Sequence, residues 1–220
     1  MELYEALYTT RSMRRVTSRP IPIAIQARIL DAAIRAPTGG NLQGWRFLIV
    51  DDPGTIAALG PLYRDAIDQL WATAYKSRID EAASNPESDE SKQFDRVRRS
   101  AQWLADNFET VPLFLFAFSR FDPQGSSIYP AVWSAMLAAR AEGIGSCLTA
   151  VLSAFHLDEV LELLGVPRDK GWACSACVSF GYPTGRWGVA PRRPAHEVTY
   201  RNRWGAPSGL TDDGPLWPDR

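Results

Sequence analysis

The chain has 220 residues, of which 45% are apolar, a length and composition that suit one domain with a substantial core. Basic and acidic residues leave a net charge of −1, so no overall basic field indicates a nucleic-acid partner. The longest apolar runs are shorter than the ~20 residues of a membrane-spanning helix, and the acidic N-terminus differs from a secretory leader. Three cysteines cannot all pair within the chain, which favours a reducing, cytoplasmic location.

A short helix is predicted over residues 2–9, and a basic turn follows it. Three arginines and a serine lie within five residues of this turn: Arg11, Ser12, Arg14 and Arg15. Guanidinium groups can bind phosphate oxygens through paired hydrogen bonds, and a hydroxyl can complete such a site. A solvated basic turn explains the same residues equally well, so the turn alone leaves both interpretations open.

A polar loop lies between the next predicted helix and strand. Residues 23–36 carry apolar side chains near helical spacing, and the helix ends where Pro37 disfavours helical geometry in the residue before it. The aromatic and β-branched segment 45–50 predicts a buried strand. The loop between them contains two glycines and the amides of Asn41 and Gln43, on backbone that can approach a flat ligand closely.

The middle of the chain predicts helices around a central strand. The carboxylates of residues 51–54 can cap a helix start, and two helical pieces are expected within 61–108, separated by the polar turn 84–91. Their aromatic stripes are typical of core packing, and a lid over a flat ligand is the alternative. Residues 111–118 are apolar on both faces, as in a central strand covered on each side. The helix predicted over 128–142 suits either the core or a subunit interface.

Gly143 is expected to end that helix, and the chain then runs into another strand. Near its end Thr149 can present a hydroxyl, and neighbouring backbone N–H groups can point at the edge of a ligand. His156 precedes a further helix start. No acid–nucleophile pair lies near it in the sequence, so we expect a surface or capping residue rather than a catalytic base.

Cys174 and Cys177 form a Cys-Ser-Ala-Cys sequence that is similar to redox and metal motifs. Residues 172–180 predict a buried strand, on which residues three apart point to opposite faces. A redox pair would need a helix start, and a zinc site would need two further ligands. We therefore interpret both cysteines as structural.

The last part of the chain contains a second basic site and an irregular tail. Arg192 and Arg193 lie between two prolines, which stiffen the backbone around them. Residues 195–220 are rich in Pro, Gly, Arg and Trp and have little periodicity. We expect such a tail to pack on its own body or to reach across to a partner.

Four short motifs, in this order and spacing, resemble those of the nitroreductase family of flavin enzymes over about residues 3–200. They are Thr-Arg-Ser-Met-Arg-Arg, Ala-Pro-Thr-Gly-Gly-Asn-Leu-Gln-Gly-Trp-Arg-Phe, Glu-Gly-Ile-Gly-Ser, and Gly-Tyr-Pro followed by Arg-Arg-Pro. The resemblance implies an α+β fold with a mostly antiparallel central sheet flanked by helices. It also implies an intertwined homodimer with two FMN sites at the subunit interface. Residues 1–200 would form one FMN-binding domain, with 61–108 as a variable helical cover and 201–220 as a tail.

The resemblance assigns the phosphate end of FMN to basic residues from both ends of the domain. Arg11, Ser12 and Arg14 would hold the phosphate and the ribityl chain, and Arg192 or Arg193 would add charge there. Arg14 could also lie near the pyrimidine edge, where a positive charge would stabilise the reduced anionic flavin.

The resemblance assigns the flavin ring to residues from two subunits. Leu148, Thr149 and Ala150 would line the ring, and a donor from this group would contact the flavin N5. Asn41 and Gln43 would approach the ring from the other subunit with their amides.

The function implied is that of an FMN-dependent oxidoreductase with a ping-pong mechanism. NADH or NADPH would reduce bound FMN, which would then reduce an acceptor such as a nitroaromatic or a quinone. The flavin supplies the chemistry, and the protein supplies orientation and electrostatics without a catalytic side chain or a metal. The alternative is a flavin-binding storage or sequestration protein without turnover, and a dehalogenating relative is a third interpretation. Thr10, Thr38 and Gly44 depart from the arginine, serine and proline that the family often has.

Overall fold

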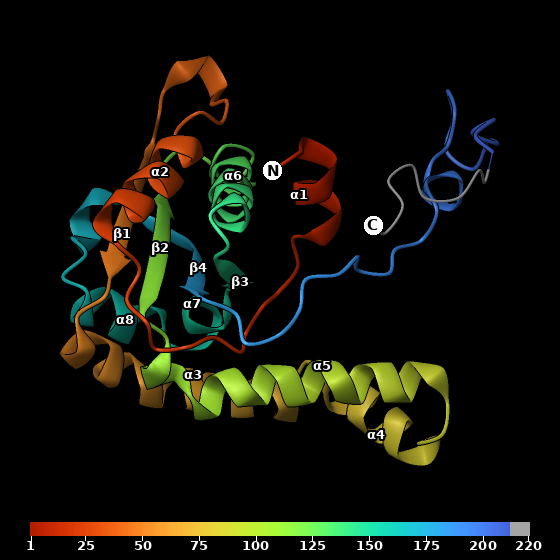
Figure 1. The fold of residues 1–220 in the computed structure, drawn as a ribbon, viewed down its shortest axis with the longest axis horizontal. Helices are drawn as coiled ribbons and strands as arrows, with labels where there is room; N and C mark the ends of the chain where they lie inside the picture. The colour runs from red at the N-terminus through yellow and green to blue at the C-terminus, as the bar shows by residue number, and fades with distance from the viewer. Residues whose placement is uncertain (212–220) are drawn as a thin grey trace.

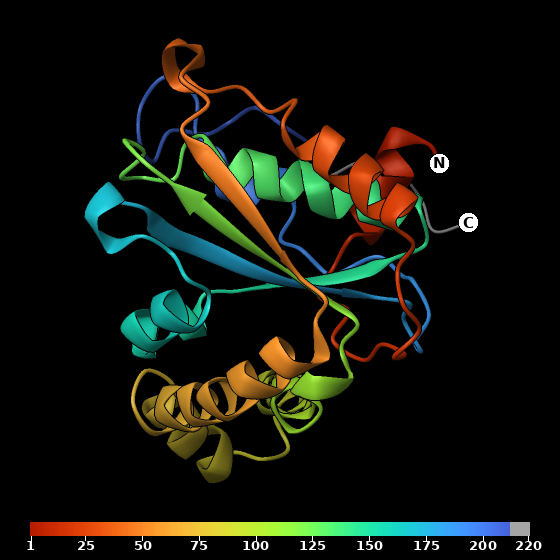
Figure 2. The same cartoon turned by 90° about the vertical axis from the view of Figure 1, so that its left-hand side faces the viewer.

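A four-stranded antiparallel sheet lies between two layers of helices in the computed structural model, which describes residues 1–211 (Figures 1 and 2). The strands are β1 (Trp45–Val50), β2 (Leu113–Ser119), β3 (Gly145–Thr149) and β4 (Ala173–Gly181). Their order across the sheet is β1-β2-β4-β3, so β1 and β3 form the two edges. The predicted α+β class with an antiparallel sheet is confirmed, whereas the intertwined dimer stays a prediction.

The helices cover both faces of this sheet, as Figure 2 shows. One layer contains α2 (Ile23–Ala33) and α6 (Ile128–Ala141), with α1 (Leu3–Thr9) beside α6. The opposite layer contains α3 (Pro53–Ala72), α5 (Asp89–Asp106), α7 (Val151–Phe155) and α8 (Leu157–Leu163). The short α4 (Lys76–Ser84) lies against α5 at the far end of that layer, away from the sheet.

Strand β2 is central because its side chains alternate between the two cores. Phe114, Phe116 and Phe118 pack with the helices of the α3 layer, while Leu113, Leu115 and Ala117 pack with α2 and α6. All seven residues of β2 are buried. Burying one such large apolar side chain contributes roughly 1.5–3 kcal/mol, so this strand supports both layers at once. The central strand expected over 111–118 is thus confirmed.

The helical segment predicted over 61–108 is divided differently from our expectation. Helix α3 already begins at Pro53, where the Asp52 carboxylate accepts the N–H of Thr55 at 2.7 Å. It ends at Ala72, before the turn that precedes α4, so three helices occupy the region instead of two. No proline or glycine marks this break in the sequence, which is why the pattern did not predict it. The polar turn does separate α4 from α5, as predicted.

The expectation that Cys174 and Cys177 face opposite sides of the sheet is wrong. The pairing of β2 with β4 shifts between Ala117 and Phe118, so that Ser175 is an extra residue in β4. Such a β-bulge reverses the alternation of side chains. Both cysteines therefore contact the same core, on the side of α3. They are free thiols, and the structural interpretation of both stands.

Candidate functional site

The basic turn runs along the outer edge of β3 in an extended conformation. Ser12 forms a bridge with Ser146, and the backbone N–H of Met13 donates to the Ser146 carbonyl at 2.9 Å. Val16 forms a second bridge with Pro183, after the end of β4. Met13 and Val16 are buried, whereas Ser12 is exposed. The turn is thus attached to the sheet by its apolar side chains and presents its polar ones to solvent.

Two glycines allow this attachment. A Cβ atom at Gly145 would lie 2.8 Å from the Cβ of Met13, and one at Gly181 would lie 2.6 Å from the Cβ of Val16. Both distances are shorter than Cβ atoms tolerate, so only glycine lets the turn approach the strands this closely. These glycines belong to the Glu-Gly-Ile-Gly-Ser and Gly-Tyr-Pro motifs, which gives a physical reason for the two motifs and ties them to the first one.

The two arginines assigned to the phosphate differ in their surroundings. Arg11 is exposed, and its Nη2 donates to the Arg186 carbonyl at 3.1 Å. Arg14 is half-buried, and its Nη1 lies 3.5 Å from the Ser100 hydroxyl of α5. Burial raises the pKa of the Cys147 thiol in β3, and the charge of Arg14 acts in the opposite sense. Arg14 therefore lies close to Cys147 of β3.

The end of β3 brings the residues assigned to the ring next to the basic turn. Leu148 is 38% exposed, Thr149 is half-buried and Ala150 is exposed. The Thr149 side chain is hydrogen-bonded to the hydroxyl of Tyr63, a residue of α3 whose ring packs 4.7 Å from that of Phe108. Burial raises the pKa of Tyr63, so its hydroxyl stays protonated and can donate. The structure thus gathers the arginine turn and the residues 148–150 on one edge of the sheet.

The loop with the two amides is strained and exposed. Asn41 and Gln43 have φ angles of 55° and 48°, in the left-handed region that costs non-glycine residues of order 1 kcal/mol or more. Two hydrogen bonds of 3.2 Å hold this shape, from the Gln43 side chain to the side-chain Oδ1 of Asn41 and from the Gln43 N–H to the Thr38 hydroxyl. A strained polar loop of this kind is typical of a binding segment.

This loop and the arginine turn lie at opposite edges of the sheet. The loop leads into β1, whereas the turn runs beside β3, with β2 and β4 between them. Strands are spaced ~4.8 Å apart, so about 14 Å separates the two edge strands. A cavity of about 90 Å³ adjoins the loop between Thr38, Leu42 and Arg120, which is well below the ~300 Å³ of small-molecule sites. One chain therefore does not bring all the predicted ring contacts together.

The tail, taken from here on as all residues after β4, starts beside the arginine turn and then leaves the body. The Thr184 N–H donates to the Arg15 carbonyl at 3.0 Å, just before the Arg186 carbonyl that Arg11 contacts. Farther on, Figure 1 shows the blue segment leading away from the sheet on the side of α1. Arg192 and Arg193 are exposed there, and Arg192 donates to the carbonyl of Pro191. Their role at the phosphate stays a prediction, and residues 212–220 of the predicted tail lie outside the described residues.

Two buried residues beside the site were not predicted from the sequence. Tyr63 was one member of an aromatic stripe, and nothing in the stripe shows which ring reaches Thr149. Arg140 lies in the last turn of α6 and is 6% exposed. It follows Met136 by four residues, so it lies on the buried face of its helix, and a charge at such a position is the signal that could have identified it.

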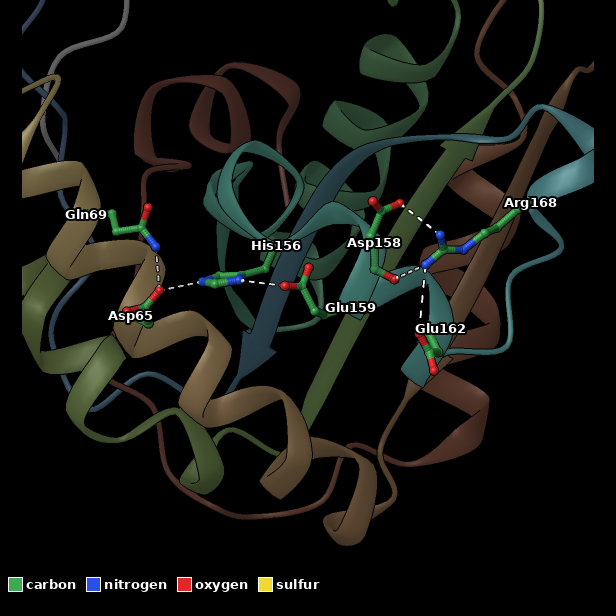
Figure 3. Close-up of polar contacts among 7 residues, drawn as sticks. All are labelled: Asp65, Gln69, His156, Asp158, Glu159, Glu162 and Arg168. Atoms are coloured by element: carbon green, nitrogen blue, oxygen red, sulfur yellow. Dashed lines mark hydrogen bonds and ion pairs between the residues drawn. The ribbon is translucent and has the colours of Figure 1, made fainter.

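His156 lies at the start of α8 and its side chain reaches toward α3 (Figure 3). Its Nε2 lies 2.6 Å from a carboxylate oxygen of Asp65 on α3, and its Nδ1 lies 3.5 Å from Glu159 on α8. Gln69 also donates to Asp65, and the bonds from Gln69 and His156 lower the pKa of this carboxylate. His156 is the N-cap residue of α8, as the capping interpretation predicts, although its side chain makes no cap hydrogen bond. The contacts support a structural link between α3 and α8.

Two further properties bear on the class of site. Among residues 1–211, no group of three or more His, Cys, Asp or Glu side chains is placed to hold a metal ion. In the same part of the chain, none of the helices combines the length and the apolar character needed to span a membrane.

Comparisons with known proteins identify the family of this chain. Protein DrgA of Synechocystis is 31% identical over 84% of this chain and 85% of its own, and the NADH dehydrogenase of Thermus thermophilus is 28% identical over 86% and 90%. The fold is similar to that of an iodotyrosine deiodinase bound to FMN and 3-iodo-L-tyrosine, with a TM-score of 0.68, 24% identity and coverage of 92% and 99%. It is also similar to that of the FMN and NADPH-dependent nitroreductase NfnB from Sphigopyxis sp. strain HMH, with a TM-score of 0.67, 23% identity and coverage of 93% and 100%. Residues 7–182 match the sequence profile of the nitroreductase family, and this chain belongs to that family.

Proposed function

We propose that the protein is an FMN-dependent oxidoreductase that passes electrons from NADH or NADPH to an oxidised acceptor, such as a nitroaromatic or a quinone. The observation that carries the proposal is the arrangement at the β3 edge. There the turn that carries Arg11, Ser12 and Arg14 is held against β3. Ser12 forms a bridge with Ser146, and Thr149 is the last residue of the same strand. Family membership and the printed activities of NfnB and of the Thermus protein point in the same direction.

The residues at this edge suit FMN. A phosphate carries negative charge and several acceptor oxygens, which match an exposed guanidinium, a hydroxyl and a second guanidinium on a fixed backbone. Gly145 and Gly181 keep this backbone close to the sheet, and a Cβ atom at either position would displace it. In this proposal the tricyclic ring would follow the phosphate along β3, past Arg14 and Thr149. FMN would supply the two-electron chemistry, and the chain would bind and orient it.

The proposal includes a homodimer, because one chain leaves the site incomplete. Asn41 and Gln43 lie about 14 Å or more from the β3 edge, as judged from the strand spacing. A second copy can present its own loop to the ring bound at β3. Tyr129 and Trp133 of α6 are apolar side chains with 44% and 40% exposure, which supply surface for such a contact. The tail, in which Trp204 is 93% exposed, would also find a surface there.

Donor and acceptor would use the same open face of the ring in turn. The helices α3, α4 and α5 extend beyond the sheet on the side of the β3 edge (Figure 1), where they can cover a substrate. Protons would come from solvent or from a backbone donor near Thr149, so no side chain is assigned as a general acid. A flat and open pocket selects weakly among planar acceptors, which favours a broad acceptor range.

Stopped-flow absorbance under anaerobic conditions tests the proposal. The purified protein with FMN should lose its flavin absorbance when mixed with NADPH or NADH, and recover it when a quinone or a nitroaromatic is added. Persistent absorbance with both donors would contradict turnover and identify a flavin-storage protein. A protein that stays colourless after incubation with excess FMN would contradict the cofactor assignment itself.

A further inference from the structure

Arg140 is a buried cation that holds the end of α1. Its Nε donates to the Thr9 hydroxyl at 2.9 Å, and its Nη2 lies 3.6 Å from a carboxylate oxygen of Glu5. The side chain of Arg140 is 8% exposed, whereas that of Glu5 is 39% exposed. Thr9 is the last residue of α1, two positions before Arg11. Arg140 therefore fixes the point from which the arginine turn starts.

The same guanidinium also holds the start of the tail. Its carbon atom lies 4.1 Å from the centroid of the Trp187 ring, a cation–π contact at short distance. Trp187 follows Arg186, whose carbonyl accepts the hydrogen bond from Arg11 Nη2. Arg140 thus contacts both segments that bracket the Arg11 side chain, α1 through Thr9 and Glu5 and the chain after β4 through Trp187.

We propose that Arg140 is a positioning residue for the phosphate site, through which the first residues of the tail set the orientation of Arg11. The proposal deepens the proposed function and rests on it. A long exposed side chain loses up to ~2 kcal/mol of rotamer freedom when it is fixed. If Arg11 is already oriented by the Arg186 carbonyl, less of this cost remains to be met when a phosphate binds. A planar guanidinium can donate hydrogen bonds in its plane while an aromatic ring stacks on its face. A lysine ammonium group has no such plane, so lysine would not replace Arg140.

The alternative is that Arg140 only stabilises the fold. A comparison of FMN with riboflavin separates the two, because riboflavin has the same ring and ribityl chain but no phosphate. A positioning role for the phosphate site lowers the affinity for FMN and leaves that for riboflavin unchanged. A general loss of stability lowers both affinities together.

The experiment uses fluorescence-quenching titrations of both flavins with the full-length chain. Trp187→Ala removes the ring on which Arg140 stacks, and Trp187 lies outside the helices and strands. Arg140→Lys keeps the positive charge but loses the planar guanidinium group. Arg28→Ala is the matched control, since Arg28 forms an ion pair of 2.7 Å with Glu142 next to the end of α6 but contacts neither segment beside Arg11. Thermal unfolding of each variant accompanies the titrations.

We expect Trp187→Ala and Arg140→Lys to weaken FMN binding roughly tenfold, the size of one charge-assisted hydrogen bond, with riboflavin binding unchanged. Arg28→Ala should bind both flavins as the native chain does. Equal losses for FMN and riboflavin, or native FMN affinity in Trp187→Ala, would overturn the positioning role. Should Arg140→Lys fail to fold, the result for Trp187→Ala decides. A native chain that binds neither flavin would instead refute the proposed function.

Discussion

The two edges of the sheet differ in how completely one chain builds them. At the β3 edge the arginine turn is fixed by bridges to Ser146 and Pro183 and by buried Met13 and Val16. At the β1 edge the amide loop is exposed, is strained at Asn41 and Gln43, and is held mainly by its own hydrogen bonds. In the proposed function the first region is one half of the flavin site, and the second is the half that a second copy would supply.

The largest effect on FMN binding should come from the arginine turn at the β3 edge. We expect Arg11→Ala combined with Arg14→Ala to lower FMN affinity ~100-fold or more, because two charge-assisted hydrogen bonds to the phosphate are lost. The measurement is FMN binding by fluorescence quenching, together with flavin content after purification. Arg15→Ala is the matched control, since Arg15 lies in the same turn but its guanidinium stacks over Trp103, 6.0 Å from the ring centroid. Full flavin occupancy in the double variant would refute the assignment.

A second prediction tests whether only the β3 edge is tightly packed. Gly145→Ala places a Cβ atom 2.8 Å from the Met13 Cβ, so we expect a loss of about 1–3 kcal/mol of unfolding free energy, the usual cost of overpacking. Flavin binding should weaken with it, as the turn is displaced. Gly39→Ala, in the amide loop, meets no atom within 4 Å and should change neither property. Thermal unfolding and FMN titration check both variants, and equal effects at the two glycines would contradict the comparison.

The amide loop at the β1 edge should contribute less to FMN binding. Gln43→Ala removes one neutral hydrogen-bonding group, which corresponds to a loss of FMN affinity of ~2- to 10-fold. Because Gln43 is exposed, the thermal midpoint measured without flavin should stay close to that of the native chain. Native FMN affinity in this variant would contradict a role of the loop in FMN binding. The flavin site would then consist of the β3 edge alone.

The smallest effect on stability concerns the start of α3, which lies outside both edge regions. Hydrogen bonds from Thr55 lower the pKa of Asp52, so the ionised carboxylate stabilises the folded state. This contribution is fully present above the pKa of an unperturbed aspartate, ~3.9, and is lost as the pH falls through the lowered value. Asp52→Asn keeps a capping side chain but removes the charge. The stability difference between the two proteins should therefore shrink toward acid pH, with FMN affinity at neutral pH unaltered; a difference independent of pH would contradict this origin.

How much of the fold the sequence predicts depends on how local the determining contacts are. Trp45–Val50 forms a strand with the predicted bounds, and the buried strand around Phe116 follows from its apolar residues alone. The bulge at Ser175 and the break after Ala72 depend on tertiary packing, and no residue type marks them.

The candidate site likewise has residues that the sequence predicts and contacts that it does not. Arg11, Ser12 and Arg14 carry a chemical signal of their own, and the structure places their turn against Ser146 of β3. Their role at FMN stays a prediction. The contact of Tyr63 with Thr149, the link from Arg140 to Thr9, and the distance between the two edges arise only when distant segments fold together.

Sedimentation velocity with simultaneous detection of protein and flavin absorbance tests the central claim most directly, because it reads cofactor and assembly in one run. With excess FMN, we predict a single species of twice the chain mass that carries one flavin per chain. A colourless species with the mass of one chain would contradict a flavin site completed by a second copy.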